Sequence, residues 1–149
     1  MSRFGRILVP MDFSPCARAA LRYALGLAAP LDAKVEVLHA VAPPPYVPLD
    51  MAIWGEAYDR LGSELSREMD ALLDELSETD RARITPRLVD GIPYEQILAA
   101  AEQSDLVVMG THGRTGVAHL LMGSVAERVV RRAPCPVITV PQRAADGAS

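Results

Sequence analysis

The sequence predicts an α/β fold, an open five-stranded parallel sheet with helices on both faces. Five short apolar segments alternate along the chain with four segments of helical character, an order typical of strands joined by right-handed crossovers. Half of the 149 residues are hydrophobic and only 5% are aromatic, so we expect a core of Leu, Val, Ile and Ala. This length predicts one domain over residues 1–149, with a disordered tail at 142–149.

The first strand is expected at Ile7-Leu8-Val9, an apolar run whose carboxyl end is Pro10-Met11-Asp12. Ser14-Pro15 then supplies an N-cap and a proline at the first helical position, and an apolar stripe predicts a helix that stops near Pro30. Asp12 therefore falls at the carboxyl end of a strand, where open parallel sheets bind their ligands. An equally good interpretation of Asp12 alone is a turn or capping carboxylate.

The next segments predict a strand, a loop and a long helix. Residues 34–41 alternate at first and then become apolar, as a second strand would, and we expect His39 to be a packed residue of that strand. The proline-rich residues 43–48 can continue neither a sheet nor a helix. From Trp54 to Leu76, apolar residues recur at steps of three and four, which predicts an amphipathic helix packed against the sheet.

The second half of the chain predicts three more strands and two more helices. Residues 83–89 include a proline, which favours an edge strand, and Gly91-Ile92-Pro93 begins a helix. The apolar run 106–109 suits a central strand covered on both faces. A further helix ends at Arg131-Arg132, and residues 137–140 form the last strand.

A glycine-rich stretch after the central strand marks the candidate site. In Gly110-Thr111-His112-Gly113-Arg114 two glycines lie three residues apart, and nine residues separate the second of them from Gly123. Ser124-Val125-Ala126-Glu127 then has the S-x-x-E form of a capping box, so a helix N-terminus that attracts anions is expected there. Glycines let backbone N–H groups approach a ligand, while His112 and Arg114 would add a donor and a positive charge. This order predicts a phosphate site, although each feature alone could be a plain turn, a cap or a loop histidine.

The same residues resemble those of a known family. Gly110-Thr111-His112-Gly113, nine residues and Gly123-Ser124 look like the ATP-binding signature of the universal stress protein family, and the likeness extends to residues 7–14 and 134–140. The resemblance implies a Rossmann-like adenine nucleotide-binding fold with strand order 3-2-1-4-5, which opens a crevice between the first and fourth strands. It also implies a homodimer that forms through the last strand, Val137–Val140.

The resemblance further implies that ATP binds in this crevice. It places the adenine near Pro10, Asp12 and Ala40, and we expect backbone N–H groups of residues 110–115 and 123–125 to hold the phosphates. The Ser124 hydroxyl would contact a phosphate or the ribose, and Mg2+ or Mn2+ would accompany the triphosphate. The expected nucleotide-binding residues are Pro10, Met11, Asp12, Ala40, Met109, Gly110, Thr111, His112, Gly113, Arg114, Thr115, Gly123, Ser124 and Val125.

Composition argues against several other classes of protein. The net charge of −4 gives no basic surface for a general nucleic-acid binder. Cys16 and Cys135 lack the spacing of a zinc site or a disulfide framework, so we expect reduced thiols in a cytoplasmic protein. No apolar stretch reaches the roughly 20 residues that span a bilayer, and the first apolar run is too short for a secretion signal.

The motifs that are missing favour a binding protein over an enzyme. The chain contains no Walker A loop, no G-x-G-x-x-G and no G-x-S-x-G elbow, and no dedicated base accompanies the glycine-rich stretch. We therefore expect an ATP-binding universal stress protein that acts as a nucleotide-dependent regulator in a stress response. Two alternatives stay open. One is a slow ATP hydrolase or phosphotransferase in which His112 and Arg114 stabilise charge, and the other is a nucleotide-free dimeric interaction module.

Overall fold

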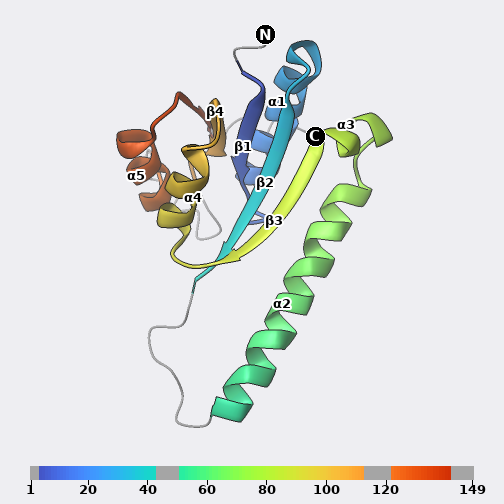
Figure 1. Cartoon of the computed structure of the whole chain (residues 1–149), viewed down its shortest axis with the longest axis vertical. Helices are drawn as coiled ribbons and strands as arrows, with labels where there is room; N and C mark the ends of the chain where they lie inside the picture. Colours follow the sequence, from blue (N-terminus) through green and yellow to red (C-terminus); the bar gives the residue numbers. More distant parts are fainter. Residues whose placement is uncertain (1–3, 43–50, 113–121, 142–149) are drawn as a thin grey trace.

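The computed structural model describes residues 4–42, 51–112 and 122–141, and it has the predicted α/β architecture (Figure 1). The predicted loop at 43–48 and the predicted disordered tail at 142–149 lie outside the described residues. The elements are β1 (Arg6–Pro10), α1 (Pro15–Leu31), β2 (Lys34–Val41), α2 (Met51–Asp74), α3 (Glu78–Arg83), β3 (Ile84–Asp90), α4 (Pro93–Ala101), β4 (Leu106–Gly110), α5 (Ser124–Arg132) and β5 (Val137–Val140).

The five described strands run parallel in one sheet, in the order β3-β2-β1-β4-β5. The order that the family resemblance implies is therefore confirmed, and so is the edge position of the third strand. β1 and β4 are neighbours, with Leu8 paired with Val107. Because the helices that follow these two strands pack on opposite faces of the sheet, the carboxyl ends of β1 and β4 border a crevice.

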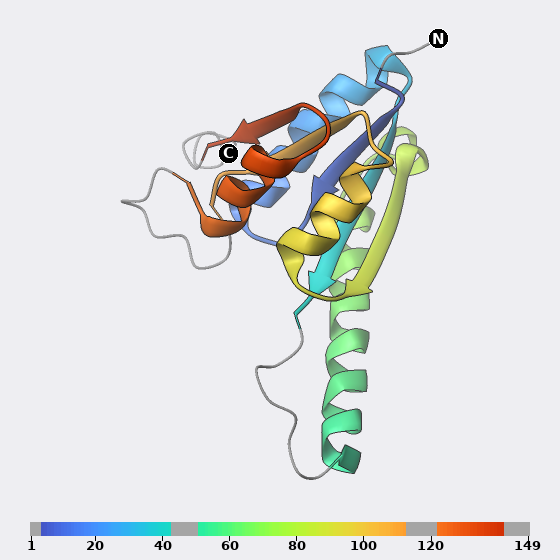
Figure 2. The same cartoon turned by 60° about the vertical axis from the view of Figure 1, so that its left-hand side comes forward.

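Helices cover both faces of the sheet (Figure 2), and an apolar cluster is buried under the helices on each face. α1 and the second half of α2 cover one face, to which β1 contributes Ile7 and Val9. α4 and α5 cover the other face, to which β1 contributes Leu8. Alternate residues of β1 are thus buried on opposite sides, which is why this strand is a continuous apolar run. The prediction of helices on both faces is confirmed.

Helix α1 has the predicted start and a slightly later end. The Ser14 hydroxyl caps the N-terminus by accepting a backbone hydrogen bond from the first turn. Pro30 lies inside the last turn, and the helix ends at Leu31, one residue beyond the predicted stop. It ends there because Asp32 adopts a left-handed conformation, with φ of 51°, which turns the chain toward β2.

The first half of helix α2 extends past the carboxyl ends of the strands (Figure 1). Leu65 and Met69 are buried, so the predicted packing stripe is confirmed for the second half of the helix. Leu61, in the same stripe, is 41% exposed, because the first half passes the carboxyl ends of the strands. The Tyr58 hydroxyl donates a hydrogen bond to the carboxylate of Asp90 at the end of β3. This hydrogen bond raises the pKa of Tyr58.

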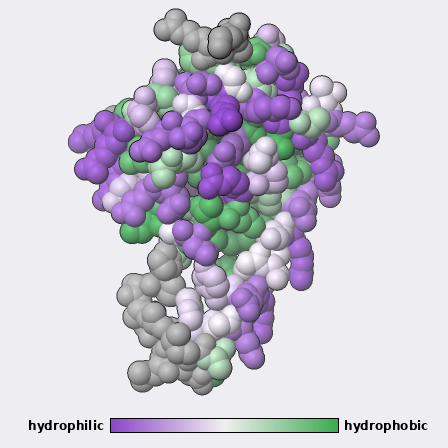
Figure 3. All heavy atoms as spheres, in the orientation of Figure 1, coloured by the Kyte–Doolittle hydropathy of each residue, from purple (hydrophilic) through white to green (hydrophobic). Residues whose placement is uncertain are grey.

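The outer surface carries an apolar area in the middle of the face seen in Figure 3. It lies over the carboxyl end of β3, beside α2. Leu88 and Ile92 are exposed large apolar residues in this part of the chain. Within the described ranges, none of the helices is both long enough and apolar enough to cross a membrane.

The prediction of four helices is wrong, because it omits the short helix α3. Ser77 caps this helix by accepting a hydrogen bond from the N–H of Asp80 at 3.2 Å. Acidic side chains lie in its first turn and basic ones in its last, which suits the helix dipole. None of its residues is buried, so no apolar period marks α3 in the sequence.

Gly110 is a point of close contact between α1 and β4. A Cβ atom at this position would lie 2.8 Å from the Cβ atom and 2.9 Å from the carbonyl carbon of Cys16. Cys16 is buried, and its thiol donates to the carbonyl of Val140 at 3.3 Å. The glycine therefore lets the helix pack closely on the sheet, a role that the sequence pattern does not indicate.

We expect Gly110→Ala to lower the free energy of unfolding by about 1–3 kcal/mol, because the added methyl group would overlap the backbone of α1. Urea denaturation followed by circular dichroism measures this change. Gly26→Ala is the matched control, since nothing lies within 4 Å of its Cβ position on α1. We expect that change to stabilise the protein by roughly 0.5–1 kcal/mol. Equal stability of Gly110→Ala and wild type would contradict the steric explanation.

Candidate functional site

A cavity of about 260 Å³ lies at the carboxyl ends of β1, β2 and β4. It is also bordered by the first residues of α4 and α5. The cavity thus occupies the crevice beside β1 and β4, where open α/β sheets bind their ligands. The predicted residues that line it are Pro10, Met11, Asp12, Ala40, Met109, Gly110, Thr111, His112, Gly123, Ser124 and Val125. Gly113, Arg114 and Thr115 lie outside the described residues and stay predictions.

The cavity has further lining residues that are not among the predicted ones. Pro93 and Ile97 come from the start of α4, which follows β3 at the same edge of the sheet. The available signal was topological, since each helix after a parallel strand begins at the carboxyl edge. His39, expected only as a packed strand residue, also reaches the cavity. The additional lining residues are Ala17, Leu38, His39, Pro93, Ile97 and Ala126.

Asp12 is fixed in the turn between β1 and α1. Its Oδ1 atom accepts a hydrogen bond from the N–H of Ser14 at 2.9 Å, so the interpretation of Asp12 as a turn carboxylate is correct. The residue also lines the cavity, so the two interpretations are compatible. The carbonyl of Met11 accepts a hydrogen bond from Nδ1 of His39 at 2.6 Å, which means that this ring nitrogen carries a proton.

Phe13, which follows Asp12, has a strained backbone. Its φ angle is 63°, in the left-handed region that bulky residues rarely adopt. The side chain is buried against the ring of His39, with 5.1 Å between the ring centroids. Strain of this kind persists only where surrounding contacts hold it, and it is most frequent at functional sites.

Backbone hydrogen bonds join the segment after β4 to β5 and to the start of α5. The N–H of Thr111 donates to the carbonyl of Val140 at 2.9 Å, and the carbonyl of Thr111 accepts from the N–H of Gly123 at 2.6 Å. The prediction that the N–H groups of residues 110–115 and 123–125 hold phosphates is therefore wrong for Thr111 and Gly123. Their N–H groups instead extend the pairing with β5 and anchor the start of α5.

The N-terminus of α5 lies at the cavity without a side-chain cap. Gly123 is the N-cap residue and Ser124 is the first residue of the helix, so the predicted capping box is wrong. The N–H groups of Ser124, Val125 and Ala126 consequently have no acceptor within the helix or on the cap side chain. All three residues line the cavity. These donors and the helix dipole make this end of the cavity favourable to an anion.

The described lining residues carry little charge. Asp12 is the one carboxylate among them, and that set contains neither Lys nor Arg. The Thr111 hydroxyl is hydrogen-bonded to Nδ1 of His112 at 2.9 Å, which fixes that ring beside the cavity. In the described part of the chain, no three His, Cys, Asp or Glu side chains are grouped to hold a metal ion. The involvement of Mg2+ or Mn2+ stays a prediction.

Fold and site together define an open α/β protein with an anion-favouring cavity where the strand order reverses. The model of the universal stress protein family matches residues 3–141. The chain is also 34% identical over 139 residues to universal stress protein MJ0531 of Methanocaldococcus jannaschii, which covers 92% of this chain and 82% of that protein. The chain belongs to the universal stress protein family.

Solved structures share the fold over nearly the whole chain. Universal stress protein UspA from Lactobacillus plantarum superposes with a TM-score of 0.83 at 28% identity, covering 94% of this chain and 99% of that one. A universal stress protein solved in complex with cAMP gives a TM-score of 0.66 at 27% identity, covering 93% and 98%. The second of these structures records an adenine nucleotide bound to a protein of this family.

We expect Ser124→Ala to change the free energy of unfolding by less than about 0.5 kcal/mol, because the Ser124 hydroxyl caps no helix. Ser14→Ala is the matched comparison. The Ser14 hydroxyl accepts from the N–H of Ala17 at 3.1 Å, and we expect its loss to cost roughly 1 kcal/mol. Urea denaturation of both variants measures these changes. If Ser124 were a cap, Ser124→Ala and Ser14→Ala would lower the free energy of unfolding by similar amounts.

Proposed function

We propose that this protein binds ATP in the cavity and acts as a nucleotide-dependent regulator in a stress response. The observation that carries the proposal is the start of α5 at the wall of the cavity, where no side-chain cap from the described residues accepts from the first backbone donors of the helix. The relative solved with cAMP supports an adenine nucleotide as the ligand. We propose that the protein acts in the cytoplasm, where the free thiols of Cys16 and Cys135 would stay reduced.

In the proposed complex, the two ends of the cavity hold different parts of the nucleotide. The adenine and ribose lie near Pro10, Asp12 and Ala40, where apolar residues of β2 and α4 offer a surface for a flat base. The phosphates lie at the N-terminus of α5, near Ser124, and residues 113–115 complete their binding site. Mg2+ or Mn2+ accompanies the triphosphate.

A regulator must present a different surface when its ligand binds. Thr111, at the cavity, is hydrogen-bonded to Val140 of the edge strand β5, so the proposed ligand site is joined directly to an outer element. We propose that ATP shifts the population of conformations in this region and thereby changes what the protein offers to a partner.

The direct test is a calorimetric titration of the purified protein with ATP, ADP, AMP and cAMP, with mass spectrometry of any ligand released on denaturation. We expect Gly123→Val to weaken ATP binding by at least about tenfold, because a side chain at the start of α5 would obstruct the phosphates. AMP, with a single phosphate, should lose less affinity. Gly26→Val is the matched control, the same change at a glycine with nothing within 4 Å of its Cβ position.

The outcomes of this test are distinct. Wild-type protein that binds none of the four nucleotides would refute the proposed function. Native ATP affinity in a folded Gly123→Val variant would show that the phosphates do not lie at α5. Released ADP together with measurable turnover would favour the slow hydrolase instead.

We also propose that two copies of the chain pair through β5, which forms an edge of the sheet. The carbonyls of Pro136 and Val140 accept hydrogen bonds from the neighbouring β4 side. Because backbone groups alternate in direction along a strand, the N–H and carbonyl of Thr139 face the open edge. An edge strand is a template for pairing with a second strand.

We expect Thr139→Pro to raise the dimer dissociation constant at least roughly tenfold, because proline removes the N–H that faces the open edge. Thr139→Val is the matched control, since it keeps both the N–H and the branched side-chain shape. Analytical ultracentrifugation over a range of concentrations measures the association. A monomeric wild-type protein, or equal association of all three proteins, would show that β5 is not the interface.

A further inference from the structure

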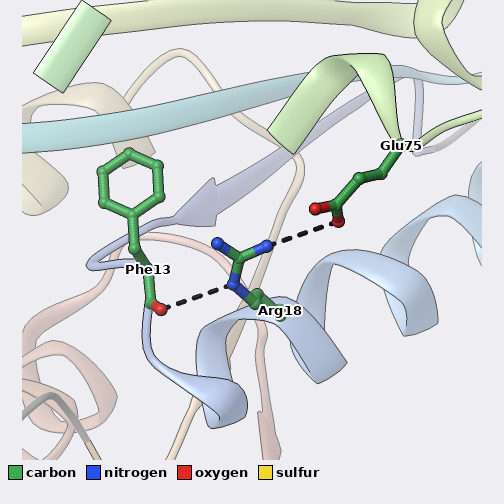
Figure 4. Close-up of polar contacts among 3 residues, drawn as sticks. All are labelled: Phe13, Arg18 and Glu75. Carbon is green, nitrogen blue, oxygen red and sulfur yellow. Dashed lines mark hydrogen bonds and ion pairs between the residues drawn. The ribbon is translucent and has the colours of Figure 1, made fainter. Parts of the chain in front are cut away.

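The strained turn at Phe13 is held by an arginine of α1. Nε of Arg18 donates to the carbonyl of Phe13 at 3.4 Å (Figure 4). Arg18 is not among the described residues that line the cavity. Its hydrogen bond to the turn gives this side chain an indirect route to a bound ligand.

Arg18 is itself oriented by Glu75, which lies just beyond the end of α2. Nη1 of Arg18 is 3.5 Å from Oε2 of Glu75, and Figure 4 shows the guanidinium between this carboxylate and the Phe13 carbonyl. The Arg18 side chain is 32% exposed and that of Glu75 is 68% exposed. An ion pair so accessible to water adds little stability, but the planar guanidinium can serve both acceptors at once.

The peptide groups on both sides of Asp12 are thus fixed by side chains. The Met11 carbonyl before it accepts from His39, and the Phe13 carbonyl after it accepts from Arg18. With both neighbours held, the turn presents Asp12 at the cavity wall in one geometry. The left-handed conformation of Phe13 lies directly beside Asp12, so a contact that holds the Phe13 carbonyl also restrains the backbone next to Asp12.

We propose that Arg18 is a positioning residue for nucleotide binding: it holds the Phe13 carbonyl and so keeps Asp12 in place at the adenosine end of the cavity. The inference rests on the proposed function, because it concerns the same cavity. It has a specific consequence. Loss of Arg18 weakens the binding of ATP and of AMP by the same factor, since both contain the adenosine that Asp12 contacts. A change at α5 weakens the binding of ATP more than that of AMP.

Arg18→Met tests this, because it removes the guanidinium and keeps most of the aliphatic stem. We expect the dissociation constants of ATP and AMP to rise equally, by about three- to tenfold, as for the loss of one partly exposed charge-assisted hydrogen bond. Arg81→Met is the matched control. Arg81 also pairs with a carboxylate at the end of α2, Asp74 at 2.9 Å, and makes no described contact with the turn. We expect wild-type affinities for that variant.

Arg18→Lys is the second variant, to be used if Arg18→Met does not fold. We expect it to weaken the binding of ATP and of AMP equally, and by less than Arg18→Met does. A merely structural role would lower the melting temperature of the variants and leave both dissociation constants unchanged, which would overturn the inference. A loss confined to ATP would overturn it as well, because it would place the effect at the phosphates. Wild-type protein that binds neither nucleotide would overturn the proposed function, and this inference with it.

Discussion

The pairing of β1 with β4 is the constraint on which the site depends. These strands are neighbours in the sheet although they are distant in the sequence, and the helices that follow them pack on opposite faces. No single helix can therefore cover both carboxyl ends, and a cavity remains between the turn after β1 and the start of α5. Residues as far apart in the chain as Pro10 and Val125 line one space for this reason.

Close packing of α1 on the sheet explains the unusual turn beside that space. β1 ends at Pro10 and α1 begins at Pro15, so the chain must reverse onto the sheet within a short turn. The helix then approaches β4 so closely that Gly110 has no room for a side chain. Phe13 adopts its strained conformation within this turn, and Arg18 and His39 hold the carbonyls on either side of Asp12. The strain is thus placed next to a residue that lines the cavity.

Most of the fold is predictable from local and periodic patterns in the sequence. Several other features depend on contacts between residues that are far apart in the chain, and these were not predicted. The cap at Ser14 and the buried run 106–109 are encoded within a few residues, and the strand order followed from a family resemblance. The packing role of Gly110 depends on Cys16, and the use of the Thr111 N–H depends on the register of β5. Most of the expected site residues do meet at the cavity, because they follow strands whose carboxyl ends share one edge. The contribution of α4 was not predicted, although the helix after β3 begins at the same edge of the sheet.

The hydrogen bonds at the start of α5 explain why this helix suits an anion better than a capping box would. In a capping box the serine side chain accepts an N–H from the first helical turn, so one donor is already occupied. Here the cap is Gly123, whose N–H donates to the Thr111 carbonyl at 2.6 Å and whose carbonyl accepts from Glu127 at 3.0 Å. Within the described residues the cap is made by backbone groups and no side chain, and the N–H groups that follow it lie at the cavity. A shift of one residue in the helix start therefore makes the Ser124 N–H, which a capping box would pair with the Glu127 side chain, one of the first donors of the helix.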